Sequence, residues 1–309
     1  MAAAIEIEGA SKRFNGFLAV DSLDLAIPEG EVYGLLGPNG AGKTTTIRMI
    51  LGIILPDAGR VRILGQPYDA EVRKRIGYLP EERGLYPKMK LGDQLDFIGG
   101  LDFIPRAERR RRIDEWCERF DLTSWKNHKV EELSRGMQQK VQFIATVLHD
   151  PEVLMLDEPF TGLDPVNTKL LKDIMLDFAK RGKTVILSTH RMEQVEMLCD
   201  RICLINKGRK VVDGALAEVK AQHGGRTVQV EYDGSVAVLE GHAGVERVDN
   251  YGKYAEVHLR EEADTQALLA SLVREVKVRR FEVMTPSIND IFIQLVGGDA
   301  PPPEPEELA

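Results

Sequence analysis

The sequence predicts an α/β fold with a mostly parallel core sheet, followed by a small α+β domain. Four short and nearly continuous apolar runs occupy residues 32–36, 153–156, 184–187 and 202–205. Such runs are typical of parallel strands that helices cover on both faces. After residue 224 the pattern changes to alternating apolar and polar residues, as in 227–232, which indicates a half-buried strand.

The region between these parts predicts a helical insert at about 88–150, where Ile113, Trp116 and Phe120 recur at helix-like spacing. We therefore expect a first domain over residues 1–222, a second over 223–298 and a disordered Pro- and Glu-rich tail over 299–309. The second domain is expected to hold strands at 227–232, 246–250 and 254–259, a helix at 264–274, a strand near 278–284 and a last helix opened by Pro286-Ser287. The apolar stripe of that last helix is expected to pack on the domain's own sheet; it consists of Ile288, Ile291, Phe292 and Leu295.

The bulk composition excludes several classes of protein. The 309 residues include 41 Lys and Arg and 49 Asp and Glu, which give a net charge of −8. This composition does not show the excess of positive charge that is typical of nucleic-acid-binding proteins. No apolar run approaches the roughly 20 residues of a membrane span, and the first ten residues do not resemble a signal peptide. Any membrane role is therefore expected to go through a partner. The three cysteines lack metal-ligand spacing and are expected to be free thiols.

Residues 37–44, GPNGAGKT, fit the phosphate-loop pattern G-x-x-x-x-G-K-[ST] between a strand and a helix. Glycines let such a loop point its N–H groups at phosphate oxygens. We expect Lys43 to act on the β- and γ-phosphates of ATP and the Thr44 hydroxyl to bind Mg²⁺. A glycine-rich turn without a ligand is the disfavoured alternative. The expected ATP contacts are Gly37, Pro38, Asn39, Gly40, Ala41, Gly42, Lys43, Thr44 and Thr45.

Two acids follow the apolar run at 153–156. A buried strand would deliver Asp157 and Glu158 at its C-terminal edge, where ligands of open α/β sheets bind. Asp157 is expected to hold Mg²⁺, and Glu158 to polarise the attacking water as general base. Behind a phosphate loop, this acidic pair predicts nucleotide hydrolysis.

Residues 133–139, LSRGMQQ, resemble the signature motif of ATP-binding cassette (ABC) ATPases; residues 161–165, TGLDP, resemble their D-loop, and Ser188-Thr189-His190 their switch histidine. The resemblance covers residues 1 to about 222. It implies a P-loop NTPase cassette with a mostly parallel core sheet, an antiparallel β part and a helical insert. It also implies a head-to-tail dimer in which Ser134, Gly136 and Asp164 contact the ATP of the opposite chain. His190 would act on the γ-phosphate beside Lys43.

Two positions of the family pattern affect what the resemblance implies. Phe14 stands where the family places an aromatic residue that stacks on adenine, with Phe17 as its rival. Glu81 stands where the family usually has a glutamine that touches the metal. Glu keeps the acceptor oxygens but lacks the amide donors. A role of Glu81 in binding the metal is therefore expected, while its role in sensing the γ-phosphate stays open.

Residues 81–86 and 286–292 resemble an exporter branch, in which a cytoplasmic ATPase with a small C-terminal domain serves a separate permease, as in bacterial sodium-extrusion and antibiotic-export systems. Leu85, Tyr86, Pro87 and Met89 either belong to the groove for the permease or are buried against the helical insert. The resemblance thus implies an ATPase that sits peripherally on the inner face of the cell membrane and powers export.

Two other functions compete with this one. A soluble ABC ATPase of DNA repair or of the ribosome would show a coiled coil or two cassettes. Residues 91–147 have no sustained heptads, and one phosphate loop occurs. A module that only holds nucleotide would not need Glu158, His190 and Asp164. The cargo is not readable from the sequence.

Overall fold

The computed structural model describes residues 2–82, 84–223, 227–235, 237–260, 263–284 and 286–296. The chain forms two compact units, Met1–Ala215 and Leu216–Ala309. The boundary precedes helix α8 (Leu216–Gln222), whereas the sequence placed it after residue 222. The tail at 299–309, expected to be disordered, lies outside the described residues.

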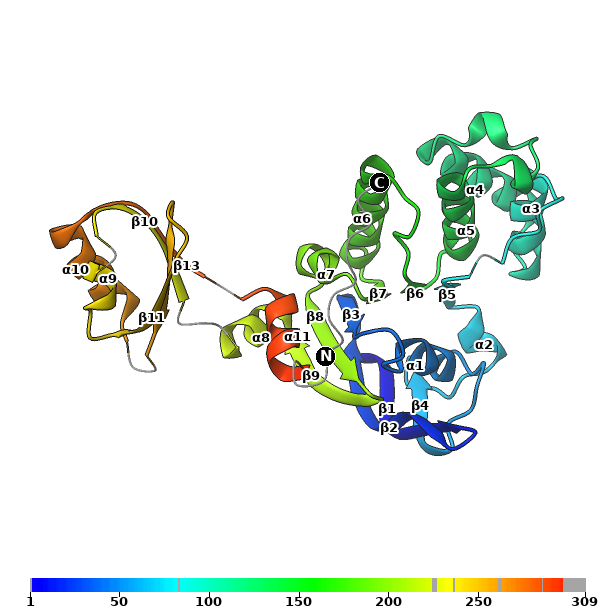
Figure 1. The fold of residues 1–309 in the computed structure, drawn as a ribbon. Coiled ribbons are helices and arrows are strands. Elements are labelled where there is room, and N and C mark those ends of the chain that lie inside the picture. Colours follow the sequence, from blue (N-terminus) through cyan, green and yellow to red (C-terminus); the bar gives the residue numbers. More distant parts are fainter. Residues whose placement is uncertain are drawn as a thin grey trace. The chain divides into compact units, whose positions relative to one another are not determined.

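A six-stranded sheet with the order β5-β6-β7-β3-β8-β9 forms the centre of the first unit (Figure 1). The first five of these strands are parallel, and β9 is antiparallel to β8. Every residue of β3, β6 and β7 is buried, which explains their apolar runs in the sequence. The α/β fold class is confirmed. The strand bounds are β3 (Val32–Leu36), β5 (Ile76–Leu79), β6 (Val153–Asp157), β7 (Thr184–Thr189), β8 (Arg201–Asn206) and β9 (Arg209–Ala215).

Helices cover both faces of this sheet. Successive side chains of a strand point to opposite faces, so the neighbours of β3 show which helix lies on each face. Tyr33 and Leu35 share a hydrophobic core with Ile47 of α1 (Lys43–Ile50). On the other face, a Cβ atom at Gly34 would lie 3.0 Å from the sulfur of Cys199, just after α7 (Met192–Leu198). Helix α6 (Pro165–Lys180) contacts β3 and β7. Because helices cover the two faces of the sheet, the residues at the ends of the strands lie beside loops.

An antiparallel sheet with the order β2-β1-β4 joins the same core as α1. Its strands are β1 (Ala3–Phe14), β2 (Phe17–Pro28) and β4 (Ala58–Ile63). Asn15 and Gly16 connect β1 to β2 with φ angles of 45° and 88°. Two successive positive φ angles are what a tight hairpin turn of type I′ requires. Phe14 and Phe17 consequently pair across the end of the hairpin.

Three helices of the insert, α3 (Leu91–Leu101), α4 (Arg106–Arg119) and α5 (Arg135–Val147), lie together beyond β5 in Figure 1. Trp116 of α4 and Phe120, which directly follows this helix, pack against Phe143 of α5, with ring centroids 6.4 and 5.8 Å from that of Phe143. Ser134 caps α5 by accepting a hydrogen bond from the N–H of Met137 at 3.3 Å. Shorter helical elements are α2 (Ala70–Arg73), η1 (Thr123–Trp125) and η2 (Val130–Glu132). Among the described helices, none is both long enough and apolar enough to cross a membrane.

The second unit contains a four-stranded antiparallel sheet with the order β11-β12-β10-β13. Together with the two helices that lie between its strands in the sequence, α9 and α10, this sheet follows the β-α-β-β-α-β order of the ferredoxin-like motif. Val228, Val257, Leu268 and Leu272 are in its hydrophobic core. The expected α+β character is confirmed. The bounds are β10 (Thr227–Asp233), α9 (Ala237–Glu240), β11 (Val245–Asn250), β12 (Ala255–Leu259), α10 (Thr265–Glu275) and β13 (Lys277–Val283).

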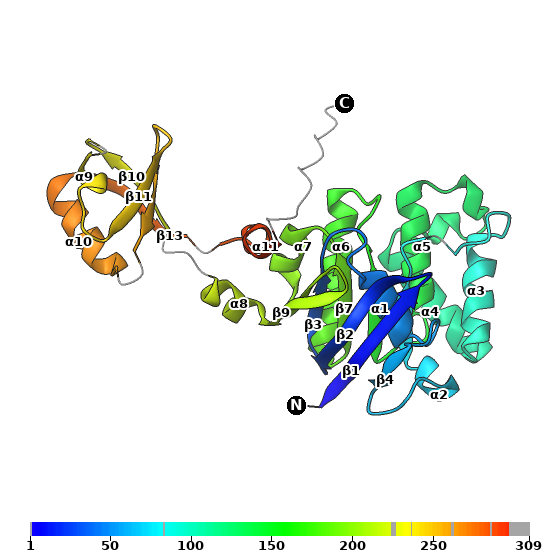
Figure 2. The same ribbon diagram turned by 60° about the horizontal axis from the view of Figure 1, so that its bottom comes forward.

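Helix α11 (Ile288–Val296) departs from the sequence prediction. Ile288 and Ile291 are buried, but the core of the four-stranded sheet contains neither of them. In Figures 1 and 2 α11 lies near α8 and away from that sheet. The prediction that its stripe packs on the domain's own sheet is wrong. An amphipathic stripe shows that a helix buries one face, but it does not say which element covers that face.

Candidate active site

The loop between β3 and α1 curves around the ammonium group of Lys43. Gly37 and Gly42 have φ angles of 149° and 107°, which side chains with a Cβ atom rarely adopt. A Cβ atom at Gly42 would lie 2.5 Å from the backbone oxygen of Ala19, so glycine is required there. The ammonium of Lys43 donates to the backbone oxygens of Gly37 at 2.7 Å and Pro38 at 3.1 Å.

Lys43 is 7% exposed, and three acids face it. Burial lowers the pKa of Lys43, and the charges of Glu158, Asp157 and Glu81 act in the opposite direction. The acids come from two separate segments of the chain. Their charges therefore meet at one ammonium group.

Strand β6 delivers Asp157 to this point. Its carboxylate accepts a hydrogen bond from the Thr44 hydroxyl at 3.1 Å, which joins the end of β6 to the start of α1. Burial raises the pKa of Asp157, although the bond from Thr44 and the charge of Lys43 lower it. The hydroxyl oxygen of Thr44 and a carboxylate oxygen of Asp157 thus lie together at the start of α1, and both are atoms of the kind that bind cations.

Glu158 leaves the strand with a φ angle of 48°, a conformation that costs a non-glycine residue about 1–3 kcal/mol. Its carboxylate accepts hydrogen bonds from the His190 N–H at 2.9 Å, from His190 Nδ1 at 2.6 Å and from the Thr189 hydroxyl at 3.1 Å. Because a carboxylate only accepts hydrogen bonds, Nδ1 of His190 carries the proton in this contact. The last residue of β7 and the residue after it therefore hold Glu158 in place.

Glu81 reaches the same edge of the sheet because β5 pairs with β6. It follows β5 by two residues, is exposed, and lines the same cavity as Lys43 and Asp157. The structure thus brings together all three expected metal contacts, Thr44, Asp157 and Glu81.

A cavity of about 470 Å³ opens onto these groups, within the range usual for small-molecule sites. Phe14 and Phe17 line it and are 44% and 64% exposed, so neither belongs to the core. Gly37 and Pro38 contact Lys43 but do not line the cavity. The lining residues are Phe14, Phe17, Ala19, Asn39, Gly40, Ala41, Gly42, Lys43, Thr44, Thr45, Glu81, Asp157, Glu158 and His190.

The sequence predicted Phe14 as the adenine contact, with Phe17 as its rival, but Ala19 was not predicted. The signal that could have found all three is the dipeptide Asn15-Gly16, the strongest short-range indication of a hairpin. A hairpin with this turn brings its two flanking residues side by side, and Ala19 lies on its return strand.

Ser134, Gly136 and Asp164 lie elsewhere, at the starts of α5 and α6, and none of them lines the cavity. Asp164 accepts a hydrogen bond from the N–H of Asn167 at 2.9 Å, the main cause of its lowered pKa. A Cβ atom at Gly136 would lie 3.2 Å from the backbone oxygen of Gly162, so the signature loop and the D-loop pass close together. Ser134 and Asp164 are exposed.

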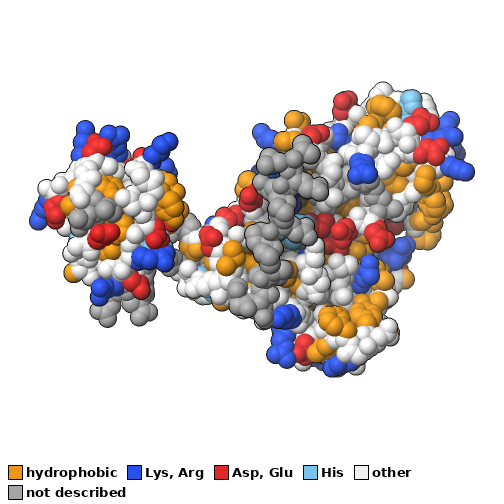
Figure 3. All heavy atoms as spheres, in the orientation of Figure 1, with side chains coloured by type: hydrophobic (Ala, Val, Ile, Leu, Met, Phe, Trp, Pro, Cys, Tyr) orange, Lys and Arg blue, Asp and Glu red, His pale blue; other side chains and the backbone are white. Residues whose placement is uncertain are grey.

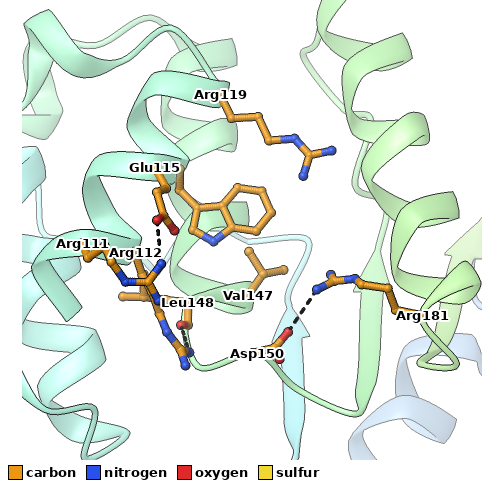
Figure 4. Close-up of a pocket in the computed structure, with 9 residues that line it drawn as sticks. Arg111, Arg112, Glu115, Arg119, Val147, Leu148, Asp150 and Arg181 are labelled. Atoms are coloured by element: carbon orange, nitrogen blue, oxygen red, sulfur yellow. Dashed lines mark hydrogen bonds and ion pairs between the residues drawn. The ribbon is translucent and has the colours of Figure 1, made fainter. Parts of the chain in front are cut away.

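A second cavity, of about 320 Å³, lies beside α4 (Figure 4). Each of its four arginines already has a carboxylate partner, for example Arg119 with Asp177 at 2.7 Å and Arg181 with Asp150 at 3.6 Å. It contains neither a phosphate loop nor the acidic pair. Its lining residues are Arg111, Arg112, Glu115, Trp116, Arg119, Val147, Leu148, Asp150 and Arg181.

Known proteins match both units. Residues 20–161 match the family described as ABC transporter, and residues 214–296 match the C-terminal domain of DrrA1-3-like ATP-binding proteins. YhaQ of Bacillus subtilis strain 168, described as an uncharacterized ABC transporter ATP-binding protein, is 45% identical over 293 residues, which are 95% of this chain and 98% of YhaQ. This chain belongs to the ATP-binding proteins of ABC transporters.

Further matches agree with this family. Nod factor export ATP-binding protein I of Paraburkholderia xenovorans strain LB400 is 35% identical over 300 residues, covering 96% of this chain and 97% of that protein. A solved structure of an ATP-binding subunit of an ABC transporter is 30% identical with a TM-score of 0.67, covering 71% of this chain and 93% of its own. ABC transporter ATP-binding proteins hydrolyse ATP to power transport. The resemblance to an exporter branch is confirmed.

Proposed function

We propose that this chain binds ATP with Mg²⁺ in the 470 Å³ cavity, closes on a second copy of itself, and powers export through a separate membrane permease. One observation carries the proposal. The cavity unites the phosphate loop, the acids and His190, while Ser134, Gly136 and Asp164 lie outside it.

ATP would bind along the loop. The N–H groups at the start of α1 attract the phosphates, and Lys43 turns from its own loop oxygens to the β- and γ-phosphate oxygens. Phe14 stacks on adenine, a contact worth about 1–3 kcal/mol by analogy with other base–aromatic pairs. Phe17 lies across the hairpin from it.

The oxygen atoms of Thr44, Asp157 and Glu81 fit Mg²⁺, a hard cation that prefers oxygen ligands. Within the described parts of the chain, no group of three or more His, Cys, Asp or Glu side chains could hold a metal ion. Phosphate oxygens would therefore complete the coordination, as is usual for Mg²⁺ in nucleotide sites. The bound ion would neutralise negative charge on the triphosphate.

Glu158 is the proposed general base, and it takes the proton of the water that attacks the γ-phosphate. Thr189 and His190 keep its carboxylate at the cavity. His190 would also contact the γ-phosphate from the side of Lys43. These chemical roles require ATP and water in the same cavity.

A second copy supplies the rest of the site. Ser134 and Gly136 present the start of α5, a place that favours anions. Because these residues do not line the cavity of their own chain, the nucleotide they contact belongs to the other copy. Asp164 would reach the same interface in a head-to-tail dimer.

The permease would dock beside α3 and hold the chain at the inner face of the membrane. Leu85 and Met89 are half-buried, Pro87 is exposed, and Tyr86 is 54% exposed. Tyr86 packs edge to face against Phe97 of α3, with ring centroids 6.0 Å apart. Figure 3 shows apolar side chains gathered along this edge. Exposed apolar groups of this kind mark interaction surfaces. We therefore favour the hypothesis that residues 85–89 contact the permease over the alternative that they are buried against the helical insert.

The test of this proposal is dimer formation. Glu158→Gln should bind ATP with Mg²⁺ and migrate as a dimer in gel filtration, and as a monomer without nucleotide. Adding Ser134→Arg should return it to monomer, because bulk and charge then stand at the closed interface. If the protein migrates as a dimer with and without nucleotide, and also with Ser134→Arg, the head-to-tail arrangement is refuted.

A further inference from the structure

One buried glutamine of α5 holds the segment that carries Glu81. Gln142 is 5% exposed, and its side-chain nitrogen Nε2 donates to the backbone oxygens of Pro80 and Glu82, at 3.1 Å each. These two residues flank Glu81 in the chain. The amide therefore fixes the backbone on both sides of one proposed metal contact.

The orientation of this amide follows from its neighbours. Both contacts are carbonyl oxygens, which only accept hydrogen bonds, so the NH₂ group must face them. The other atom, Oε1 of Gln142, is buried and has no hydrogen-bond partner among the described residues. A buried oxygen without a partner is destabilising. Packing alone would thus favour an apolar side chain at this position.

We propose that Gln142 is a positioning residue for the reaction, and that it acts by holding Glu81 where its carboxylate meets Mg²⁺. Glu81 itself is exposed, so burial does not restrict its side chain. The fixed backbone on either side keeps the carboxylate on the cavity that contains Lys43 and Asp157. This inference rests on the proposed role of Glu81 as a metal contact.

The expected effect is on metal affinity. Loss of a partner that orients a metal ligand typically weakens metal binding 10- to 100-fold. Gln142→Met keeps the length of the side chain and removes both donors. It should raise the Mg²⁺ concentration needed for tight ATP binding about 10-fold, while ATP affinity in a chelator should not fall, because the negative charge of Glu81 is no longer held beside the triphosphate.

Thr146→Val is the matched control. Thr146 lies one turn further along α5, and its hydroxyl faces two backbone oxygens, that of Gln142 at 2.9 Å and that of Tyr78 in β5 at 3.3 Å. This variant also removes a bond from α5 to the β5 segment, but not one beside Glu81. It should leave the Mg²⁺ requirement unchanged.

The experiment measures equilibrium ATP affinity over a series of Mg²⁺ concentrations, in full-length chains that carry Glu158→Gln. Gln142→Met is compared alone and combined with Glu81→Ala, with Gln142→Leu as a second variant and thermal unfolding as the check on folding. If Gln142 acts through Glu81, the combined variant should match Glu81→Ala alone. An unchanged Mg²⁺ requirement in Gln142→Met, or an equal shift in both backgrounds, would overturn the inference. Failure of the parent Glu158→Gln chain to bind ATP would instead overturn the proposed function.

Discussion

The cassette carries two sets of proposed ATP contacts that differ in burial. In the cavity, Lys43 is 7%, Asp157 2% and Glu158 9% exposed, and hydrogen bonds tie each of them to neighbouring segments. At the starts of α5 and α6, Ser134 and Asp164 are exposed and cap their own helices. The first set is arranged before ATP arrives, and the second stays in water until another surface covers it. This difference in burial supports the proposal that one chain binds the nucleotide and that turnover requires two.

The largest effect is expected inside the cavity. Glu158→Gln keeps the shape of the side chain but loses its basicity, so the rate of ATP hydrolysis should fall about 10²- to 10⁴-fold while ATP binding survives. Phosphate release and nucleotide affinity measure the two quantities. Glu152→Gln changes an acid just before the same strand, where it pairs with Arg75, and this variant should hydrolyse ATP normally. If Glu158→Gln hydrolysed ATP at nearly the rate of the parent chain, Glu158 would not be the general base.

Mixing two inactive variants tests whether the two sets of contacts act on one nucleotide from different chains. A chain with Lys43→Ala and a chain with Ser134→Ala should each hydrolyse ATP slowly. When they are mixed, one composite site combines an intact Lys43 with an intact Ser134 from the other copy. Phosphate release from the mixture should therefore exceed the sum of the separate rates. Simple addition of the two rates would mean that each site is complete within one chain.

A smaller effect is expected at the rim of the cavity. Phe14→Ala should weaken ATP binding about 5- to 150-fold, the equivalent of a 1–3 kcal/mol stacking contact. Phe17→Ala should have the smaller effect, and Phe14→Trp should restore binding. Nucleotide affinities of the three variants decide the order. A larger loss in Phe17→Ala would move the adenine contact to Phe17.

The smallest effect is expected at Glu81, which is exposed like Ser134 but lines the cavity like Asp157. With Mg²⁺ present, Glu81→Gln should leave ATP affinity nearly unchanged. In a chelator the same change should tighten ATP binding, because one negative charge beside the triphosphate has gone. Affinities of both proteins under both conditions are compared. Equal values in each matched pair would place Glu81 outside the site.

Part of this site could be predicted from the sequence because its residues are local in the chain. The phosphate loop needs only the strand before it and the helix after it, and Asp157 and Glu158 end one apolar run. Ser134 and Asp164 likewise act as caps within their own helices, so short motifs identify them. The fold class followed from the same runs, because strands buried on both faces leave a continuous apolar pattern.

Other features were decided by strand pairing and by packing between distant segments. Glu81 joins Asp157 because β5 lies beside β6, and Gln142 reaches Pro80 and Glu82 from another helix. The apolar stripe of α11 predicted that one face of this helix is buried, but not which element covers it. The prediction that this face packs on the domain's own sheet was wrong. The sequence by itself determined the phosphate loop, the acids and the α/β class, since backbone geometry and burial leave local patterns. Only the tertiary structure decided which of these residues share a cavity, because register and helix packing depend on contacts between residues far apart in the chain.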